Sequence, residues 1–232
     1  MIEMVGVYTD DRRVLHLRGC SLRAEASQIH ALVGPSSSGK TLVLDVLVGL
    51  VRPVRGMAQV LGIDSALDNA SVRERVTYIP RGGVADTGMT LSAHVTWVSR
   101  LAGAHPTPTD VRRALRDAEV PDRYFDRPPS EAPLESRVLA WLAVASLRRH
   151  RVVLLDEPMH VLSAGATNHV SHVLRQWRST GACILLTSQD RQFVDTVADV
   201  VTAIEDGRTA GPIVFERPPR PLPLTSDPLP GE

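Results

Sequence analysis

The chain has 232 residues, and its 26 acidic residues balance its 26 basic ones, so the formal net charge is zero. This length suits one large α/β domain, or a core domain that carries a subdomain, with enough residues to bury a substantial hydrophobic core. The balanced charge argues against direct binding to nucleic acid or to an anionic membrane surface, so we expect contact with either to pass through another protein.

The N-terminus and the cysteines indicate a cytoplasmic protein. Residues 1–13 include acids and lack an apolar h-region, and no stretch reaches the roughly 18 apolar residues that a membrane span needs. Cys20 and Cys183 lie far apart and have no metal-ligand spacing. We interpret both as reduced thiols, with a disulfide as the alternative. We therefore expect no membrane insertion by this chain itself.

Strand-like and helical patterns alternate along the chain. Apolar segments typical of strands occur at residues 2–8, 28–33, 75–80, 152–156, 182–187 and 199–204. Apolar residues at helical spacing predict helices over 41–50, after Thr109, and from Val170 to a C-terminal cap at Gly181. This alternation predicts a largely parallel sheet that helices cover on both faces.

The remaining segments suggest how the chain is divided. Residues 88–150 contain helical patterns, several prolines and no good strand, which predicts a helical subdomain inserted between sheet strands. Residues 217–232 are dominated by proline and lack the apolar content to pack, which is typical of a disordered or extended tail. A proline-rich docking motif is the alternative. We expect one domain over residues 1–216, followed by this tail.

The single lysine of the chain, Lys40, lies in the segment GPSSSGKT at residues 34–41. This segment matches the phosphate-binding loop GxxxxGK[ST], whose backbone N–H groups and following helix N-terminus converge on nucleotide phosphates. The lysine meets the β- and γ-phosphates, and the Thr41 hydroxyl is placed to ligate Mg²⁺. Because the segment follows an apolar strand and precedes an apolar helix, we favour a nucleotide site over a chance match. The expected binding residues of the loop are Gly34, Pro35, Ser36, Ser37, Ser38, Gly39, Lys40 and Thr41.

A second strand ends in two acids, in the segment VVLLDEP at residues 152–158. Asp156 can hold the Mg²⁺ shell together with Thr41, and Glu157 can polarise a water molecule in line with the γ-phosphate. Acids also cap the ends of strands for structural reasons. Beside a phosphate-binding loop, however, we favour a catalytic pair.

With these motifs in this order, residues 1–215 resemble the nucleotide-binding subunit of ABC transporters. GPSSSGKT is similar to the Walker A motif and VVLLDEP to Walker B with its glutamate. Residues 51–64 are similar to the segment after the P-loop helix, and residues 205–211 to a late hairpin. The resemblance implies an α/β P-loop NTPase fold of the ABC ATPase type, with a mostly parallel sheet, an N-terminal antiparallel β portion and a helical subdomain. It also implies ATP and Mg²⁺ as cofactors and stacking of Tyr8 on adenine, the alternative being an ordinary strand tyrosine.

Four positions depart from the family pattern. Arg81 occupies the position of the Q-loop glutamine, and APLES at residues 132–136 replaces the LSGGQ signature. Ser163 replaces the D-loop aspartate, and Gln189 replaces the switch histidine. Glu135, within APLES, would face a partner's γ-phosphate, and two negative charges repel. Gln189 can donate a hydrogen bond to a γ-phosphate but cannot carry a positive charge. We therefore expect weak hydrolysis by the chain alone.

The resemblance implies two kinds of partner, namely a separate polytopic membrane subunit and a second ATPase subunit. In this family two ATPase subunits enclose two ATP molecules, each between the Walker A motif of one chain and the signature of the other. A homodimer of this chain would have two poor signatures. A heterodimer with an intact partner would have one better site, built on Lys40, Asp156 and Glu157.

Two other functions remain open from the sequence. The chain could be a nucleotide-binding regulatory or structural subunit that does not hydrolyse ATP, which the four altered positions favour. It could also be a soluble ABC-type ATPase that acts on DNA or the ribosome. Such relatives usually have long coiled-coil insertions or two cassettes in one chain, and this sequence has neither.

Overall fold

The computed structural model describes residues 1–10, 16–85, 87–148 and 151–214, and the expected tail at 217–232 lies outside the described residues. The strands are β1 (Ile2–Tyr8), β2 (Arg18–Ala24), β3 (Gln28–Val33), β4 (Arg55–Val60), β5 (Ile63–Asp64), β6 (Val76–Ile79), β7 (Val152–Asp156), β8 (Cys183–Ser188), β9 (Val200–Glu205), β10 (Arg208–Thr209) and β11 (Ile213–Val214). The α-helices are α1 (Lys40–Leu47), α2 (Asn69–Arg75), α3 (Leu91–Leu101), α4 (Pro108–Asp117), α5 (Leu134–Arg148), α6 (Ala164–Ser179) and α7 (Arg191–Val197). Short 3-10 helices are η1 (Asp122–Tyr124), η2 (Pro129–Glu131) and η3 (Pro158–Val161).

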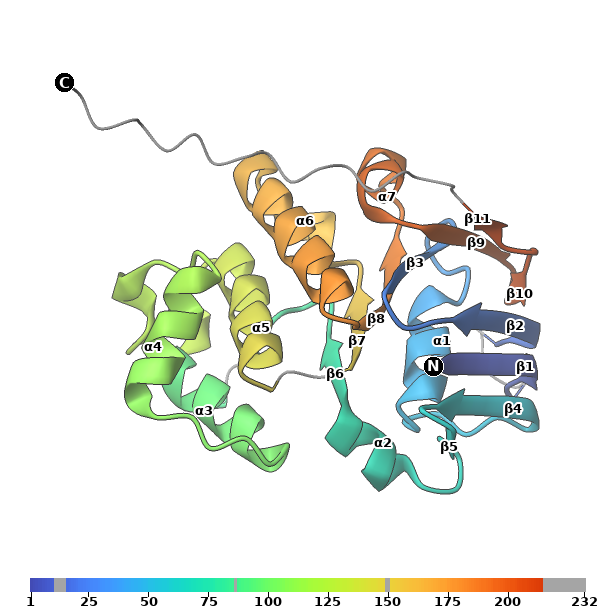
Figure 1. The fold of residues 1–232 in the computed structure, drawn as a ribbon, viewed down its shortest axis with the longest axis horizontal. Coiled ribbons are helices and arrows are strands. Elements are labelled where there is room, and N and C mark those ends of the chain that lie inside the picture. Colours follow the sequence, from blue (N-terminus) through green and yellow to red (C-terminus); the bar gives the residue numbers. More distant parts are fainter. Residues whose placement is uncertain (11–15, 86, 149–150, 215–232) are drawn as a thin grey trace.

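The strands form two sheets (Figure 1). The smaller sheet is antiparallel, in the order β2-β1-β4-β5. The larger sheet has the order β10-β9-β3-β8-β7-β6, with β11 also paired to β9, and its neighbours from β9 to β6 are parallel. The predicted combination of a mostly parallel sheet and an N-terminal antiparallel portion is therefore confirmed.

Helix α1 lies between the two sheets and shares a hydrophobic core with both (Figure 1). Successive residues of β7 point to opposite faces, as the strand geometry requires. Val152 and Leu154 belong to the core around α1, whereas Val153 and Leu155 belong to the core on the opposite face. Burial of both faces explains why this strand is continuously apolar.

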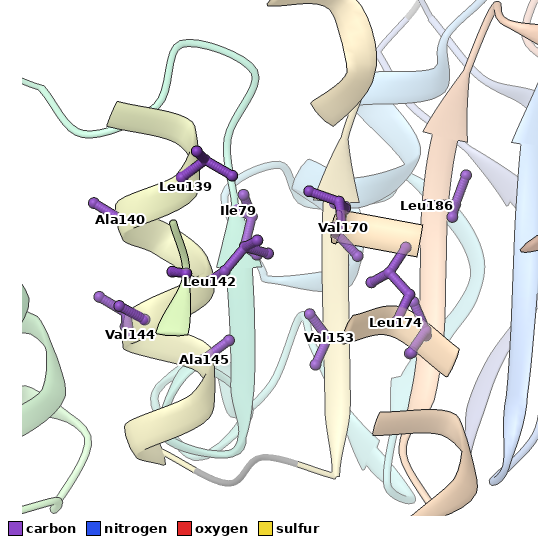
Figure 2. Close-up of a cluster of buried hydrophobic side chains, with 14 of the residues drawn as sticks. Ile79, Leu139, Ala140, Leu142, Val144, Ala145, Val153, Val170, Leu174 and Leu186 are labelled. Atoms are coloured by element: carbon purple, nitrogen blue, oxygen red, sulfur yellow. The ribbon is translucent and has the colours of Figure 1, made fainter. Parts of the chain in front are cut away.

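Helices α5, α6 and α7 contribute to the core on the opposite face of the larger sheet. Figure 2 shows Leu142 of α5 close to Ile79 of β6, and Leu174 of α6 between Val153 of β7 and Leu186 of β8. Each fully buried leucine of this kind contributes about 1.5–3 kcal/mol of transfer free energy. This packing fixes the strand ends that carry the candidate site.

Between β6 and β7 the described residues form helices and no strand, with α3, α4 and α5 packed on one another in this same core. Helix α4 begins at Pro108, slightly before the expected start, because Thr107 and Asp110 form a capping box and proline suits the first helical position. Helix α6 ends at Ser179, and Gly181 follows with a φ of 100°. No helix in the described ranges has both the length and the apolar content to cross a membrane.

Candidate nucleotide-binding site

The loop between β3 and α1 has a backbone that only glycine permits at two positions. A Cβ atom on Gly34 would lie 2.1 Å from the carbonyl oxygen of Ile204, on the neighbouring strand β9. Gly39 is the N-cap of α1 and has a φ of 107°. The Ser38 carbonyl accepts a hydrogen bond from the Gly207 N–H at 3.0 Å, in the hairpin turn between β9 and β10. The hairpin predicted at residues 205–211 therefore supports this loop.

Lys40, the first residue of α1, folds back over the loop. Its ammonium donates to the carbonyl oxygens of Gly34 and Pro35, both at 2.8 Å, and lies 3.2 Å from Oε1 of Glu157. An ammonium has three N–H donors, and these three oxygens can accept all of them. The side chain is only 4% exposed, so this positive charge is fixed at the loop rather than free in solvent.

Thr41 and Asp156 lie side by side. The Thr41 hydroxyl is within hydrogen-bonding distance of both carboxylate oxygens of Asp156, at 3.1 and 2.9 Å. A third residue, Thr187 of β8, donates to Asp156 Oδ1 at 2.8 Å and accepts from the Glu157 N–H at 2.9 Å. Sequence reasoning missed Thr187, although a hydroxyl at the end of an otherwise apolar strand was the available signal. One buried hydroxyl therefore orients both acids.

Glu157 has the left-handed backbone conformation, with φ 43° and ψ 51°. Its carboxylate contacts Lys40 at 3.2 Å and Arg81 at 3.4 Å, and it accepts a hydrogen bond from Gln189 Nε2 at 2.8 Å. Burial acts to raise the pKa of Glu157, but the hydrogen bonds from Gln189 and Lys40 and the charges of Lys40 and Arg81 outweigh it and lower the pKa. The carboxylate is therefore ionised at neutral pH.

The serines of the loop differ in their surroundings. The Ser36 hydroxyl donates to Gln189 Oε1 at 3.3 Å, so it connects the loop to the residue after β8. Ser37 is exposed and has a φ of 62°. Ser38 is buried, and its hydroxyl oxygen has no hydrogen-bond partner among the described residues. With α1 lacking a side-chain cap, the loop and the helix N-terminus offer donors that suit an anion.

Tyr8 lies at the end of β1 and is 41% exposed. Its ring lies against β2, because a Cβ atom on Gly19 would be 2.9 Å from the tyrosine hydroxyl. The next residue, Thr9, exchanges hydrogen bonds with Leu17, whose side chain lies against Gly39. The end of β1 therefore borders the loop, although among the described residues no hydrogen bond or ion pair joins Tyr8 to Lys40, Asp156 or Glu157 directly.

Two of the four departures from the expected pattern contact Glu157, and the other two contact each other. Arg81 and Gln189 both bind the Glu157 carboxylate. Glu135, in the first turn of α5, accepts hydrogen bonds from the N–H and the hydroxyl of Ser163, at 2.9 and 2.7 Å. Sequence reasoning identified these positions but not these interactions.

The oxygen groups of Thr41 and Asp156 fit Mg²⁺ only when a bound phosphate supplies further ligands. The described residues include no group of three or more His, Cys, Asp or Glu side chains that could hold a metal by themselves. Thr41 and Asp156 supply two oxygen-bearing groups at one point. Mg²⁺ typically takes one or two carboxylates and completes its shell with water and substrate phosphate oxygens.

Sequence comparison identifies relatives of the chain. The model of the family described as "ABC transporter" matches residues 17–160. The daunorubicin/doxorubicin resistance ATP-binding protein DrrA of Streptomyces peucetius is 27% identical over 210 residues, which cover 88% of this chain and 62% of DrrA. "ABC transporter 1" of Ajellomyces capsulatus is 29% identical over 212 residues, covering 87% of this chain and 16% of that protein. The chain thus spans less than two thirds of the length of these relatives.

Solved structures show the same fold at lower sequence identity. The ATP-binding subunit of an ABC transporter superposes with a TM-score of 0.82 at 20% identity, covering 93% of this chain and 90% of that one. The dimeric cassette MJ0796 bound to ADP and Pi gives a TM-score of 0.83 at 16% identity, covering 92% and 98%. The fold is that of an ABC-type P-loop ATPase cassette. Since the family match also covers more than half of the sequence, the chain belongs to the ABC transporter family.

Proposed function

We propose that the chain is the ATP-binding subunit of an ABC transporter, with one cassette domain over residues 1–216. In this proposal it binds MgATP between its Walker motifs and a partner ATPase subunit. The observation that carries the proposal is the convergence of Lys40, Thr41, Asp156 and Glu157, because the two pairs are more than 100 residues apart in sequence. These are the groups that phosphate and Mg²⁺ binding require.

Each residue of the site has a proposed role. Lys40 and the backbone N–H groups of Gly34, Ser36, Ser37, Ser38 and Gly39 would surround the phosphates, and the Pro35 carbonyl would hold the Lys40 ammonium in place. Thr41 and Asp156 would hold Mg²⁺, which when bound supplies positive charge against the phosphate oxygens. Tyr8, exposed at the end of β1, would stack on adenine. Glu157 would accept the proton of the attacking water, and Gln189 would hold the Glu157 carboxylate in place.

The same contacts support slow hydrolysis by the isolated chain. Glu157 is in contact with two cations, Lys40 and Arg81, and its pKa is lowered. A carboxylate with a lowered pKa is a weaker general base. Glu135 places a negative charge in the segment that corresponds to the signature, where the partner's ATP would bind.

We further propose that a separate polytopic membrane subunit holds the chain at the inner face of the cell membrane. The ribose import ATP-binding protein RbsA of Chelativorans sp. is 25% identical over 214 residues, which cover 89% of this chain and 41% of RbsA, and its name links such a cassette to import. A heterodimer suits the chain better than a homodimer, because an intact partner signature would complete the site at Lys40. Mixing with the partner cassette is expected to raise turnover, and unchanged turnover would contradict the heterodimer.

The test is Mg²⁺-dependent ATP turnover of the purified chain beside Lys40→Ala and Glu157→Gln. A tenfold loss of rate corresponds to about 1.4 kcal/mol of transition-state stabilisation, and we expect at least that loss in both variants. Glu131→Gln, which alters an exposed acid paired with Arg127, is the matched control and is expected to keep the wild-type rate. Removal of Mg²⁺ with EDTA is expected to abolish turnover.

A subunit that binds ATP without hydrolysing it is the second candidate, and the ion pair between Arg81 and Glu157 favours it. Equal background rates in the wild type and both variants, together with ATP binding that requires Lys40, would support this candidate. A third experiment distinguishes a transporter subunit from a cassette that acts on DNA or the ribosome. Co-purification of the tagged chain with a polytopic protein from solubilised membranes would exclude the cassette that acts on DNA or the ribosome.

A further inference from the structure

Arg81 lies directly beside the proposed catalytic carboxylate. It follows β6, whose parallel neighbour β7 ends at Asp156, so both chain segments leave the sheet at the same edge. The Arg81 Nη2 atom is 3.4 Å from Oε2 of Glu157, and the Arg81 side chain is 47% exposed. The guanidinium is therefore half in solvent and can change its partner at little cost in buried contacts.

The two oxygens of Glu157 have different partners. Oε1 contacts Lys40 at 3.2 Å and accepts from Gln189 at 2.8 Å, whereas Oε2 contacts Arg81. One carboxylate group thus separates Arg81 from the lysine that meets the terminal phosphates in a P-loop.

A terminal phosphate that reaches Lys40 also approaches the Glu157 carboxylate, and these negative charges repel. The nearby arginine can offset this repulsion, since its planar fork of N–H donors matches two phosphate oxygens. The backbone around Arg81 is held in place. The Gly83 N–H donates to the Pro80 carbonyl at 3.1 Å, the Val84 N–H donates to the Arg137 carbonyl at 3.1 Å, and Arg137 Nε donates to the Val84 carbonyl at 2.7 Å. A change of partner therefore needs only rotation of the Arg81 side chain.

We propose that Arg81 binds the terminal phosphate of ATP by leaving Glu157, so that the chain distinguishes ATP from ADP. The proposal rests on the proposed binding of MgATP at Lys40. It gives Arg81 two effects in one movement, because the arginine stabilises the bound triphosphate and frees one oxygen of Glu157. With ADP bound, Arg81 stays on Glu157.

The test compares the dissociation constants of a non-hydrolysable ATP analogue and of ADP, both with Mg²⁺, for the wild type, Arg81→Ala and Arg81→Lys. We expect Arg81→Ala to weaken binding of the ATP analogue by about tenfold or more, and binding of ADP by less than about twofold. Arg81→Lys keeps the charge but loses the fork, so an intermediate loss is expected. The control is Arg127→Ala, which removes a 63% exposed arginine that is paired with Glu131 at 3.5 Å. This variant is expected to match the wild type in its affinity for both nucleotides.

A second comparison isolates the exchange of partners. Glu157→Gln removes the negative charge that competes for Arg81, so it is expected to strengthen binding of the ATP analogue in the wild-type background. The gain is expected to be smaller in the Arg81→Ala background, where only the relief of repulsion between residue 157 and the phosphate remains. Thermal unfolding of each variant checks that the fold is intact.

Three outcomes overturn the proposal. Arg81→Ala could weaken both nucleotides equally, which would indicate a structural role, or it could weaken neither. In both cases the proposed function is still supported if the wild type binds nucleotide and Lys40→Ala does not. A wild-type chain that binds neither nucleotide would overturn the proposed function as well.

Discussion

The carboxylate of Glu135 accepts two hydrogen bonds from Ser163, one from its backbone N–H at 2.9 Å and one from its hydroxyl at 2.7 Å. This contact joins the first turn of α5 to the N-cap of α6, and α5 belongs to the helices inserted between β6 and β7. The residues are 28 positions apart in sequence, so the contact fixes how these two helix starts lie against each other.

Glu135→Ala is expected to lower the free energy of unfolding by about 1 kcal/mol, because the exposed N–H and hydroxyl of Ser163 lose a charged acceptor. Urea unfolding measures the change. The matched control is Glu131→Ala, whose ion pair with Arg127 is exposed and 3.5 Å long, and whose loss is expected to cost less than about 0.5 kcal/mol. Equal effects of the two substitutions would contradict a specific role for the Glu135–Ser163 contact.

Thr187→Val is expected to lower ATP turnover more than nucleotide affinity. It keeps the shape of the side chain but removes the hydroxyl that holds Asp156 and the Glu157 N–H, and both groups are buried. Asp156 keeps its contact with Thr41, but leaving the buried Glu157 N–H without a partner costs about 1–3 kcal/mol of stability.

Thr77→Val on β6 is the matched control for this substitution. Thr77 is also fully buried, but its hydroxyl has no hydrogen-bond partner among the described residues. Valine at position 77 is expected to leave stability unchanged or to raise it, as measured by urea unfolding, and to leave turnover unchanged. Similar losses in both variants would show that the Thr187 hydroxyl does not orient the acids.

The buried His30 makes stability depend on pH. Its Nδ1 donates to the Arg23 carbonyl at 3.0 Å, and its Nε2 lies 2.9 Å from the Thr202 hydroxyl, which donates to Nε2 when the ring is neutral. Burial lowers the pKa of His30 from 6.5 to about 4, against the opposing effect of the hydrogen bond to Arg23. Below pH 6.5 the unfolded chain therefore binds a proton that the folded chain does not.

The His30 contribution to stability is thus present above pH 6.5 and is lost as the pH falls towards 4. The loss is about 1.4 kcal/mol per pH unit, or about 2 kcal/mol between pH 6.5 and 5. Urea unfolding at pH 7 and pH 5 is expected to show this loss in the wild type, beyond the loss seen in His30→Gln. The same pH dependence in both proteins would exclude His30 as its source.

The two cysteines are expected to resist thiol reagents in the folded chain. Both Cys20 and Cys183 are free and buried, and burial raises their pKa values to about 11 and about 12. At pH 8 the thiolate fraction of the more acidic thiol is on the order of one in a thousand. Ellman's reagent is expected to label neither quickly in the native protein and both in guanidinium chloride. Fewer than two thiols in denaturant would indicate the disulfide instead.

The sequence predicted the elements whose signals are local. The central strands were located within a residue or two, because a strand buried on both faces is apolar at every position. The phosphate-binding loop and the two acids at the end of β7 also form local patterns, since their chemistry fixes residue types at short spacing. The division into one domain and a tail stays a prediction.

Strands β2 and β4 were not predicted, although they complete the smaller sheet. Their sequences, RGCSLRA and RGMAQV, mix arginine, glycine and polar residues with few apolar ones. Both pair with β1, which lies between them and supplies hydrogen bonds on both sides. Such pairing joins segments far apart in sequence. Within β2, the alternation of buried Cys20, Leu22 and Ala24 with exposed Ser21 and Arg23 was a strand signal that sequence reasoning missed.

The sequence by itself predicted a phosphate-binding loop at Lys40 in an α/β fold, because the loop, its glycines and its lysine are contiguous. The tertiary structure decided what Glu157 contacts. Arg81, Gln189 and Thr187 reach the two acids from β6 and β8, which lie on either side of β7. The order of strands in the sheet sets these distances, and that order results from packing of the whole core rather than from any one segment.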